Sequence, residues 1–160
     1  MAGGPANWQS VAFDTTGRVF EMDYEGGTNA RRQHGIGVED SLGANAIAYL
    51  TFEAPQVLPS GTAKLRLELK ADAVTGNAKI NPKWFSYAPT ENFDTMTLNA
   101  EGVNTVTWAT GDNDDFKELK VTLDADTIVA GEKIFIALTF ETASWTLAVR
   151  MLCLASIIWE

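Results

Sequence analysis

The chain has 160 residues, 46% of them hydrophobic and 21% charged, and its formal net charge is −9 at pH 7. This composition fits one globular domain that buries its own core, and it excludes a chain that is disordered throughout. The negative charge disfavours nucleic acids and anionic membranes as ligands, because both are polyanions. With Cys153 as its only cysteine, the chain forms no internal disulfide, so folding needs no oxidising compartment.

Residues 1–45 are predicted to form an N-terminal arm that contains one or two strands, one of them over 18–24. Residues 26–45 are rich in glycine, and their sizeable hydrophobic residues are Ile36, Val38 and Leu42. Burying these three returns less than about 10 kcal/mol, whereas ordering the segment costs on the order of 20–40 kcal/mol. We therefore expect the arm to become ordered only against a partner.

Residues 46–160 are predicted to form the body of the domain. In 63–70, leucines alternate with charged residues, which is typical of a strand with one buried and one solvated face. Further strands are expected over 46–53, 78–87, 103–110, 119–123, 134–140 and 146–159, separated by turns rich in proline, glycine and asparagine. The predicted fold class is all-β, an antiparallel β-sandwich of jelly-roll type, with about eight or more strands and at most one helical turn, near 124–128.

The last predicted strand, 146–159, is apolar on both faces. Such a strand is buried on both faces, whereas one face of a two-layer sandwich is normally solvated. We therefore expect its outer face to be covered, either by the N-terminal arm or by a second copy of the chain. The second alternative predicts a homo-oligomer, with a trimer preferred to a dimer.

Candidate partner-binding residues lie near the two ends of the chain. A basic cluster stands in the irregular segment, and arginine binds carboxylates through two parallel hydrogen bonds. Tryptophans are enriched at protein interfaces and stack on sugars, although most tryptophans on strands lie in the core. The selected contact residues are the basic cluster, a neighbouring isoleucine and the tryptophans nearest the ends: Arg31, Arg32, His34, Ile36, Trp8 and Trp159.

No pattern of residues indicates catalysis, and no cofactor is expected. With one histidine and one cysteine the chain cannot build a typical zinc cluster, and it has neither a Gly-x-Ser-x-Gly elbow nor a phosphate-binding glycine motif. Asp112, Asp114 and Asp115 are the only candidate ligands for a metal ion such as Ca²⁺, but aspartates in this setting are more typical of a solvated hairpin turn. The sequence therefore predicts a protein that is not an enzyme and holds no metal.

The body of the chain resembles a domain found in structural proteins of tailed phages. Residues 58–78 are similar to a segment in which a strand ends in a glycine turn, and the next strand carries aromatic residues, as Trp84 and Phe85 do here. Residues 129–136 are similar to the Ala-Gly-Asp/Glu turn and apolar strand found further along. The resemblance covers residues 55–160 and implies a jelly-roll domain in a virion.

This resemblance implies a structural function. The expected function is capsid decoration, in which the chain binds the major capsid protein of an assembled shell and stabilises it as a cement protein. Residues 1–5 lack the basic and apolar segments of a secretory signal, so we expect synthesis in the host cytoplasm and incorporation into the virion. The alternative is a tail-fibre, spike or carbohydrate-binding module that recognises host glycans through exposed tryptophans.

Overall fold

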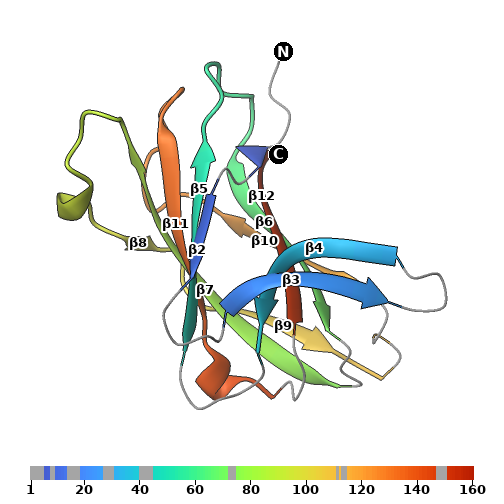
Figure 1. The fold of residues 1–160 in the computed structure, drawn as a ribbon. Helices are drawn as coiled ribbons and strands as arrows, with labels where there is room; N and C mark the ends of the chain where they lie inside the picture. The colour runs from blue at the N-terminus through green and yellow to red at the C-terminus, as the bar shows by residue number, and fades with distance from the viewer. Residues whose placement is uncertain are drawn as a thin grey trace.

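Two antiparallel sheets of six strands each lie face to face in the computed structural model (Figure 1). The structure describes residues 6–7, 10–13, 19–26, 31–39, 45–71, 75–110, 112, 115–146 and 151–160, and within these ranges it describes side chains from residue 35 onward, except at 143. Most consecutive strands belong to different sheets, so the chain winds both sheets into one sandwich. The predicted all-β, antiparallel sandwich is confirmed.

Sheet A has the strand order β10-β6-β12-β4-β3, and β1 pairs with β12. Its strands are β1 (Ala6–Asn7), β3 (Val19–Gly26), β4 (Arg31–Val38), β6 (Ala63–Ala71), β10 (Lys117–Thr122) and β12 (Met151–Trp159). Sheet B has the order β2-β5-β11-β7-β8, and β9 pairs with β7. Its strands are β2 (Ser10–Phe13), β5 (Ala46–Glu53), β7 (Gly76–Tyr87), β8 (Asn99–Ala100), β9 (Asn104–Trp108) and β11 (Lys133–Phe140).

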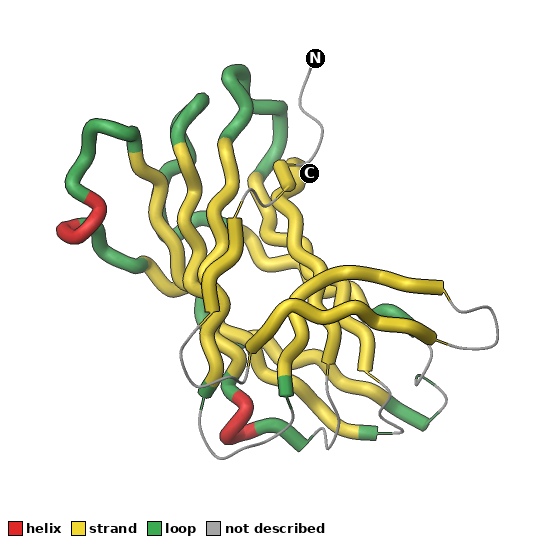
Figure 2. Tube along the Cα trace, in the orientation of Figure 1, coloured by secondary structure: helices red, strands yellow, loops and turns green. Residues whose placement is uncertain are grey.

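Helix is confined to two single turns in the described part of the chain (Figure 2). These 3₁₀ turns are η1 (Phe93–Thr95), between β7 and β8, and η2 (Thr142–Ser144), after β11. The helical turn predicted near 124–128 is absent, because that loop contains bends only. Among the described residues, no helix has the length and hydropathy to cross a membrane.

One hydrophobic core fills the space between the two sheets. Burial alternates along β5 and along most of β6, because successive side chains of a strand point to opposite faces. The largest fully buried side chains come from both sheets and include Trp84, Trp108, Phe52, Phe140, Ile36 and Leu67. Inward faces therefore follow the alternation of the sequence, and the outward faces are left for solvent or a ligand.

The N-terminal region contributes four strands, β1 to β4, where one or two were predicted, and these strands join both sheets. Strand β4 pairs with β3 over its whole length and with β12 over residues 36–38. Ile36 and Val38 on β4 are fully buried in the core. The prediction of an irregular segment is therefore wrong for β4, because it counted hydrophobic burial and omitted the backbone hydrogen bonds to two neighbouring strands.

Strand β4 is the neighbour of β12 in sheet A, and the outer side chains of β12 lean over it. Leu152 on that face is fully buried, and Leu154 is half-buried. A Cβ atom at Gly35 of β4 would lie 2.6 Å from Leu154 Cδ2 and 2.8 Å from Leu152 Cδ1, so the two leucines fill the space beside this glycine. Both coverings predicted for the outer face of β12, the N-terminal arm and a second copy of the chain, stay predictions.

A close backbone contact fixes the end of β12 beside Gly61. The Thr62 N–H donates to the Glu160 carbonyl oxygen at 2.8 Å, and the Glu160 N–H donates to the Thr62 carbonyl oxygen at 3.1 Å. Gly61 has a φ of +110°, and a Cβ atom there would lie 2.8 Å from the Glu160 carbonyl carbon and oxygen. Both the backbone conformation and the contact therefore require glycine at this position.

A comparison of two glycine substitutions tests this contact. Gly61→Ala is expected to lower the free energy of unfolding more than Gly102→Ala does. Both residues have a positive φ, but a Cβ at Gly102 meets nothing within 4 Å. Gly102→Ala is expected to cost about 1 kcal/mol, and Gly61→Ala about 1–3 kcal/mol more, as measured by urea unfolding. Equal losses would show that Glu160 moves away freely.

Candidate functional site

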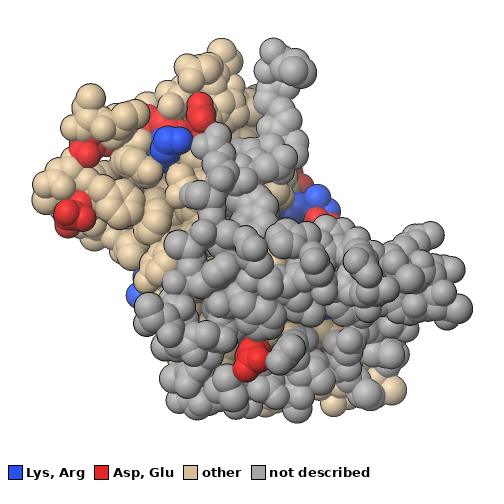
Figure 3. All heavy atoms as spheres, in the orientation of Figure 1, with Lys and Arg blue, Asp and Glu red and all other residues tan. Residues whose placement is uncertain are grey.

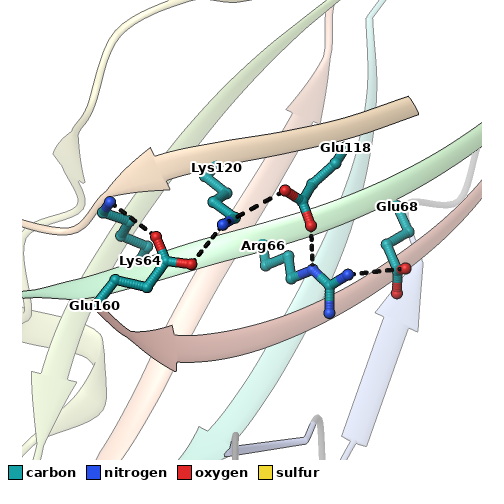
Figure 4. A network of polar contacts seen from close by, with 6 residues as sticks. All are labelled: Lys64, Arg66, Glu68, Glu118, Lys120 and Glu160. Carbon is teal, nitrogen blue, oxygen red and sulfur yellow. Dashed lines mark hydrogen bonds and ion pairs between the residues drawn. The ribbon is translucent and has the colours of Figure 1, made fainter. Parts of the chain in front are cut away.

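The outer face of sheet A is a ladder of charged side chains from β6, β10 and the end of β12 (Figure 4). Arg66 donates from Nε to Glu118 Oε2 at 2.6 Å and pairs with Glu68 at 3.1 Å. Glu160 accepts a hydrogen bond from Lys64 Nζ on Oε2 at 3.1 Å, and it pairs with Lys120 Nζ through Oε1. Every charge drawn in Figure 4 thus has an opposite partner, and this part of the surface offers no unbalanced charge to a ligand.

The same contacts shift the protonation of the network. The hydrogen bond from Arg66 lowers the pKa of Glu118, and the hydrogen bonds from Lys120 and Lys64 lower the pKa of Glu160. The hydrogen bond to Glu160 raises the pKa of Lys120. All of these groups lie on the solvated surface, where ion pairs contribute little to stability and are screened by salt.

The outer face of sheet B differs, because it carries a cluster of aromatic rings. Phe135 of β11 lies directly opposite Phe85 of β7, with ring centroids 5.2 Å apart. Tyr49 of β5 stacks on Phe135, with centroids 5.8 Å apart and planes 16° apart. Tyr87 lies edge-on to Phe85 at 5.8 Å. We call this set, together with Phe93, the aromatic cluster.

Phe93 of η1 packs on the cluster from the connection between β7 and β8. Its ring centroid lies 4.9 Å from that of Phe135 and 5.3 Å from that of Phe85, both edge-on. The ring remains 43% exposed, and Leu98, before β8, is 39% exposed. In Figure 1 this connection projects beside sheet B, and in Figure 3 the corresponding surface is mainly neutral with scattered acidic groups. Sheet B and this connection thus form a floor and a wall of different exposure. The wall is exposed at Phe93 and Leu98, whereas in the floor Phe85 is only 3% exposed and Tyr49, Tyr87 and Phe135 are half-buried.

Two alanines flank Lys83 on the outer face of sheet B. Lys83 of β7 lies opposite Ala137 of β11 on one side and opposite Ala100 of β8 on the other. Neighbouring strands are about 4.8 Å apart, so the two alanines are about 10 Å from each other. The Lys83 side chain therefore has a small residue on each neighbouring strand.

The remaining outer face of β7 is polar. Asn77, Lys79, Asn81 and Lys83 follow one another at every second position and are half-buried. The Asn77 and Asn81 Oδ1 atoms are shielded from solvent and accept no hydrogen bond. A buried acceptor without a donor costs about 1–3 kcal/mol of folding free energy.

The backbone of this polar strand is held firmly. The Lys79 carbonyl oxygen accepts hydrogen bonds from the Glu141 N–H at 2.9 Å and from Trp145 Nε1 at 3.0 Å. On the inner side, Trp84 Nε1 donates to Glu101 Oε1 at 2.5 Å, and that oxygen also accepts the Asp124 N–H at 2.8 Å. These bonds fix the strand whose outer face carries the lysines and asparagines.

The tryptophans do not form the exposed platform that the glycan-binding alternative expected. Trp84, Trp108 and Trp145 are at most 5% exposed and lie in the core, and Trp159 is half-buried and packs against it. Trp8 lies outside the described residues. Exposed aromatic surface in the described part of the chain comes instead from phenylalanine and tyrosine, which the sequence analysis did not select.

The other predicted site residues are not brought together with the aromatic cluster. Arg31, Arg32 and His34 lie on β4 where it pairs with β3 alone, and their side chains are outside the description. Ile36 is fully buried in the core, so it presents no surface to a partner. Phe116, which is 46% exposed, lies directly before β10, in the connection from β9.

Of the aspartates considered as metal ligands, Asp112 holds the turn between β9 and β10 with its side chain, and Asp115 donates its N–H to the Asp112 carbonyl oxygen at 3.0 Å. Asp112 Oδ2 accepts the Ala109 N–H at 2.7 Å and pairs with Lys117 at 2.7 Å. Asp114 lies outside the described residues. No group of three potential metal ligands occurs among the residues that are described. Cys153 is fully buried, and burial raises the pKa of its thiol far above the usual range, so the thiolate needed for nucleophilic attack is suppressed.

Comparisons with known proteins identify the fold but not a family. No protein-family model matches the chain, and no curated protein does. Among solved structures, the CBM22-1 xylan-binding domain of Paenibacillus barcinonensis Xyn10C matches with a TM-score of 0.53 and 11% identity, over 99% of this chain and 96% of that one. At these identities the likeness shows a shared β-sandwich fold and nothing finer.

Two further matches are enzymes that are much longer than this chain. The CBM22-1–GH10 modules of Clostridium thermocellum endo-1,4-β-D-xylanase 10B, in complex with xylohexaose, match with a TM-score of 0.54 and 18% identity over 96% of this chain. An arabinose-bound α-L-arabinofuranosidase, MgGH51, matches with a TM-score of 0.50 and 8% identity over 98% of this chain. The chain spans only 27% and 25% of these two proteins.

The pH dependence of stability tests the charged ladder on sheet A. Because the folded state lowers the pKa of Glu118, the Arg66 contact stabilises the fold above the ordinary glutamate pKa of about 4.3 and loses this effect as the pH falls through the lowered value. Glu118→Gln is therefore expected to lower the urea midpoint at pH 7 and to have little effect at pH 2. High salt should reduce the difference at pH 7. The same loss at both pH values would contradict the ion pair.

Proposed function

We propose that this domain binds a polysaccharide through the outer face of sheet B. The observation that supports this proposal most directly is the aromatic cluster. It lies on a face that a two-layer sandwich leaves to solvent, and Phe93, at the edge of the cluster, is 43% exposed. One side of a pyranose ring presents C–H groups, which pack favourably on aromatic rings, while its hydroxyl groups require hydrogen-bond partners. The face offers both, since Asn81 and Lys83 follow the cluster along β7.

The structural matches support this proposal without establishing it. One matched structure is of a xylan-binding domain, and two other matched structures contain a bound sugar. Fold likeness at 8–18% identity transfers no ligand, so the proposal depends on the side chains of this chain. We infer a binding module rather than an enzyme, because the described strand residues of the face contain aromatic, amide and ammonium groups and one carboxylate, Glu53, which is paired with Lys133.

Capsid decoration, the function expected from the resemblance, has no corresponding feature in the described part of the chain. On the outer face of β12, which motivated a trimer on the shell, Leu152 and Leu154 pack over Gly35 of β4 in the same chain. Binding to the major capsid protein and residence in a virion therefore stay predictions from sequence, and glycan binding is the function that the geometry favours.

Removal of one exposed ring tests the proposed site. Phe93→Ala is expected to weaken binding to the best polysaccharide of a glycan array about tenfold, because it removes the apolar wall and about 1.4 kcal/mol of contact energy. The matched control is Phe116→Ala, since Phe116 has a similar exposure of 46% but is not part of the aromatic cluster. Affinity electrophoresis or calorimetry measures both variants. Equal losses, or no polysaccharide bound by the unmodified chain, would contradict the proposal.

A further inference from the structure

Lys79 and Lys83 stand out among the positive charges of the molecule. Their ammonium groups have no ion pair or hydrogen bond with any described residue. Every other lysine or arginine whose side chain is described has an interaction partner: Lys64, Arg66, Lys70, Lys117, Lys120 and Lys133. In a chain with net charge −9, where carboxylates outnumber cations, these two lysines keep ammonium groups that a ligand can pair with.

Both lysines lie on the face already proposed to bind a polysaccharide. They occupy the outer side of β7, four residues apart, which places their Cα atoms about 13 Å from each other. Lys83 is flanked by Ala137 and Ala100 on the neighbouring strands. Phe85 occupies the adjacent outward position of the same strand.

The nearby carboxylates do not neutralise these lysines. Glu53 on the same face pairs with Lys133 at 4.0 Å, and Lys133 is its cross-strand neighbour. Glu101, after β8, accepts hydrogen bonds from Trp84 Nε1 and the Asp124 N–H on the inner side of the sheet, and it forms no ion pair with Lys79 or Lys83. The positive charge along β7 is therefore available to a carboxylate that lies directly over it. The net charge of −9 opposes the approach of a polyanion, as it does for nucleic acids, so the pairing must act locally and over short distances.

We propose that the ligand of this face is an acidic polysaccharide, in which uronic acid carboxylates pair with Lys79 and Lys83. This inference rests on the proposed function and specifies its ligand class. A sugar ring packs on the aromatic cluster, its carboxylate lies over the lysines, and its hydroxyl groups approach Asn77 and Asn81. The rigid, hydrogen-bonded backbone of β7 holds the two charges at a fixed spacing, so the pattern of carboxylates along the polymer contributes to specificity.

The test compares two forms of one polymer on the full chain. Polygalacturonic acid and its methyl ester have the same backbone, but esterification removes the negative charge. We expect the unmodified chain to bind the acid about tenfold more tightly than the ester, with a preference that decreases between 50 and 500 mM NaCl, because exposed and half-buried charges are screened. Hyaluronan and alginate serve as further acidic polymers, and xylan and mixed-linkage glucan as neutral ones.

Variants then assign the preference to the two lysines. Lys79→Gln and Lys83→Gln are each expected to weaken binding to polygalacturonic acid about threefold to fivefold, and the double variant about tenfold. Binding to the methyl ester should not change. Lys120→Gln is the matched control, because it removes one lysine charge from the opposite sheet, where Lys120 is paired with Glu160. Circular dichroism and urea midpoints confirm that each variant is folded.

The outcomes separate this inference from the proposed function. Binding of neutral polysaccharides without preference for any acidic polymer would overturn the inference and leave the proposed function intact. Preference for the acid that persists in the double variant, or that Lys120→Gln removes equally, would also overturn it. Failure to bind any acidic or neutral polysaccharide would contradict the proposed function, and the inference would fail with it.

Discussion

Hydrophobic side chains from both sheets meet in one core, and this burial decides which surfaces the molecule can offer to a ligand. Because successive residues of a strand point to opposite faces, each inward leucine or isoleucine places its neighbour on an outer face. Leu65 and Leu67 on β6 thus present Lys64 and Arg66 to solvent, and Ile134 and Ile136 on β11 present Phe135. The properties of the two outer faces follow from residues that the core does not use.

The two outer faces have opposite character although they belong to the same sandwich. On sheet A, diagonal pairing between β6 and β10 joins each charge to an opposite one, as between Arg66 and Glu118. On sheet B, Phe85 and Phe135 meet across strands, and the lysines of β7 keep their charge unpaired. A polar surface whose charges are paired is well solvated without a ligand. On sheet B, by contrast, a ligand that covers the exposed ring surface and pairs with the two lysines lowers the free energy.

Most of the sandwich could be predicted from the sequence, because β5, β6, β7 and β11 carry strong alternation over eight or more residues. Strand β4 could not, since its glycines at 35 and 37 supply no side-chain pattern, and its stability comes from backbone hydrogen bonds to strands distant in sequence. The register between β11 and its neighbours β5 and β7 could not be predicted from the sequence either.

For the same reason the candidate site was missed. The sequence indicates that Phe135 is an apolar residue on the outer side of its strand. Its contacts with Tyr49, Phe85 and Phe93 depend on the strand register and on the connection from β7 to β8, which packs Phe93 against the sheet. The sequence analysis assigned glycan recognition to exposed tryptophans, but Trp84 and Trp108 are fully buried and fill the core. The unpaired state of Lys79 and Lys83 is also a tertiary property, because only the folded chain shows which carboxylates reach a partner.

The location of the bound glycan is the central claim, and backbone amide chemical shifts measure it directly. An NMR titration of the ¹⁵N-labelled chain with the polysaccharide fragment it binds best should shift resonances on the outer face of sheet B, at Thr51, Asn81, Lys83, Phe85 and Phe135. Amides of the charged ladder on sheet A, at Arg66, Glu118 and Lys120, should not move. The largest shifts at the ladder, or at the loops joining the sheets, with no change at Phe85 and Phe135, would contradict the account.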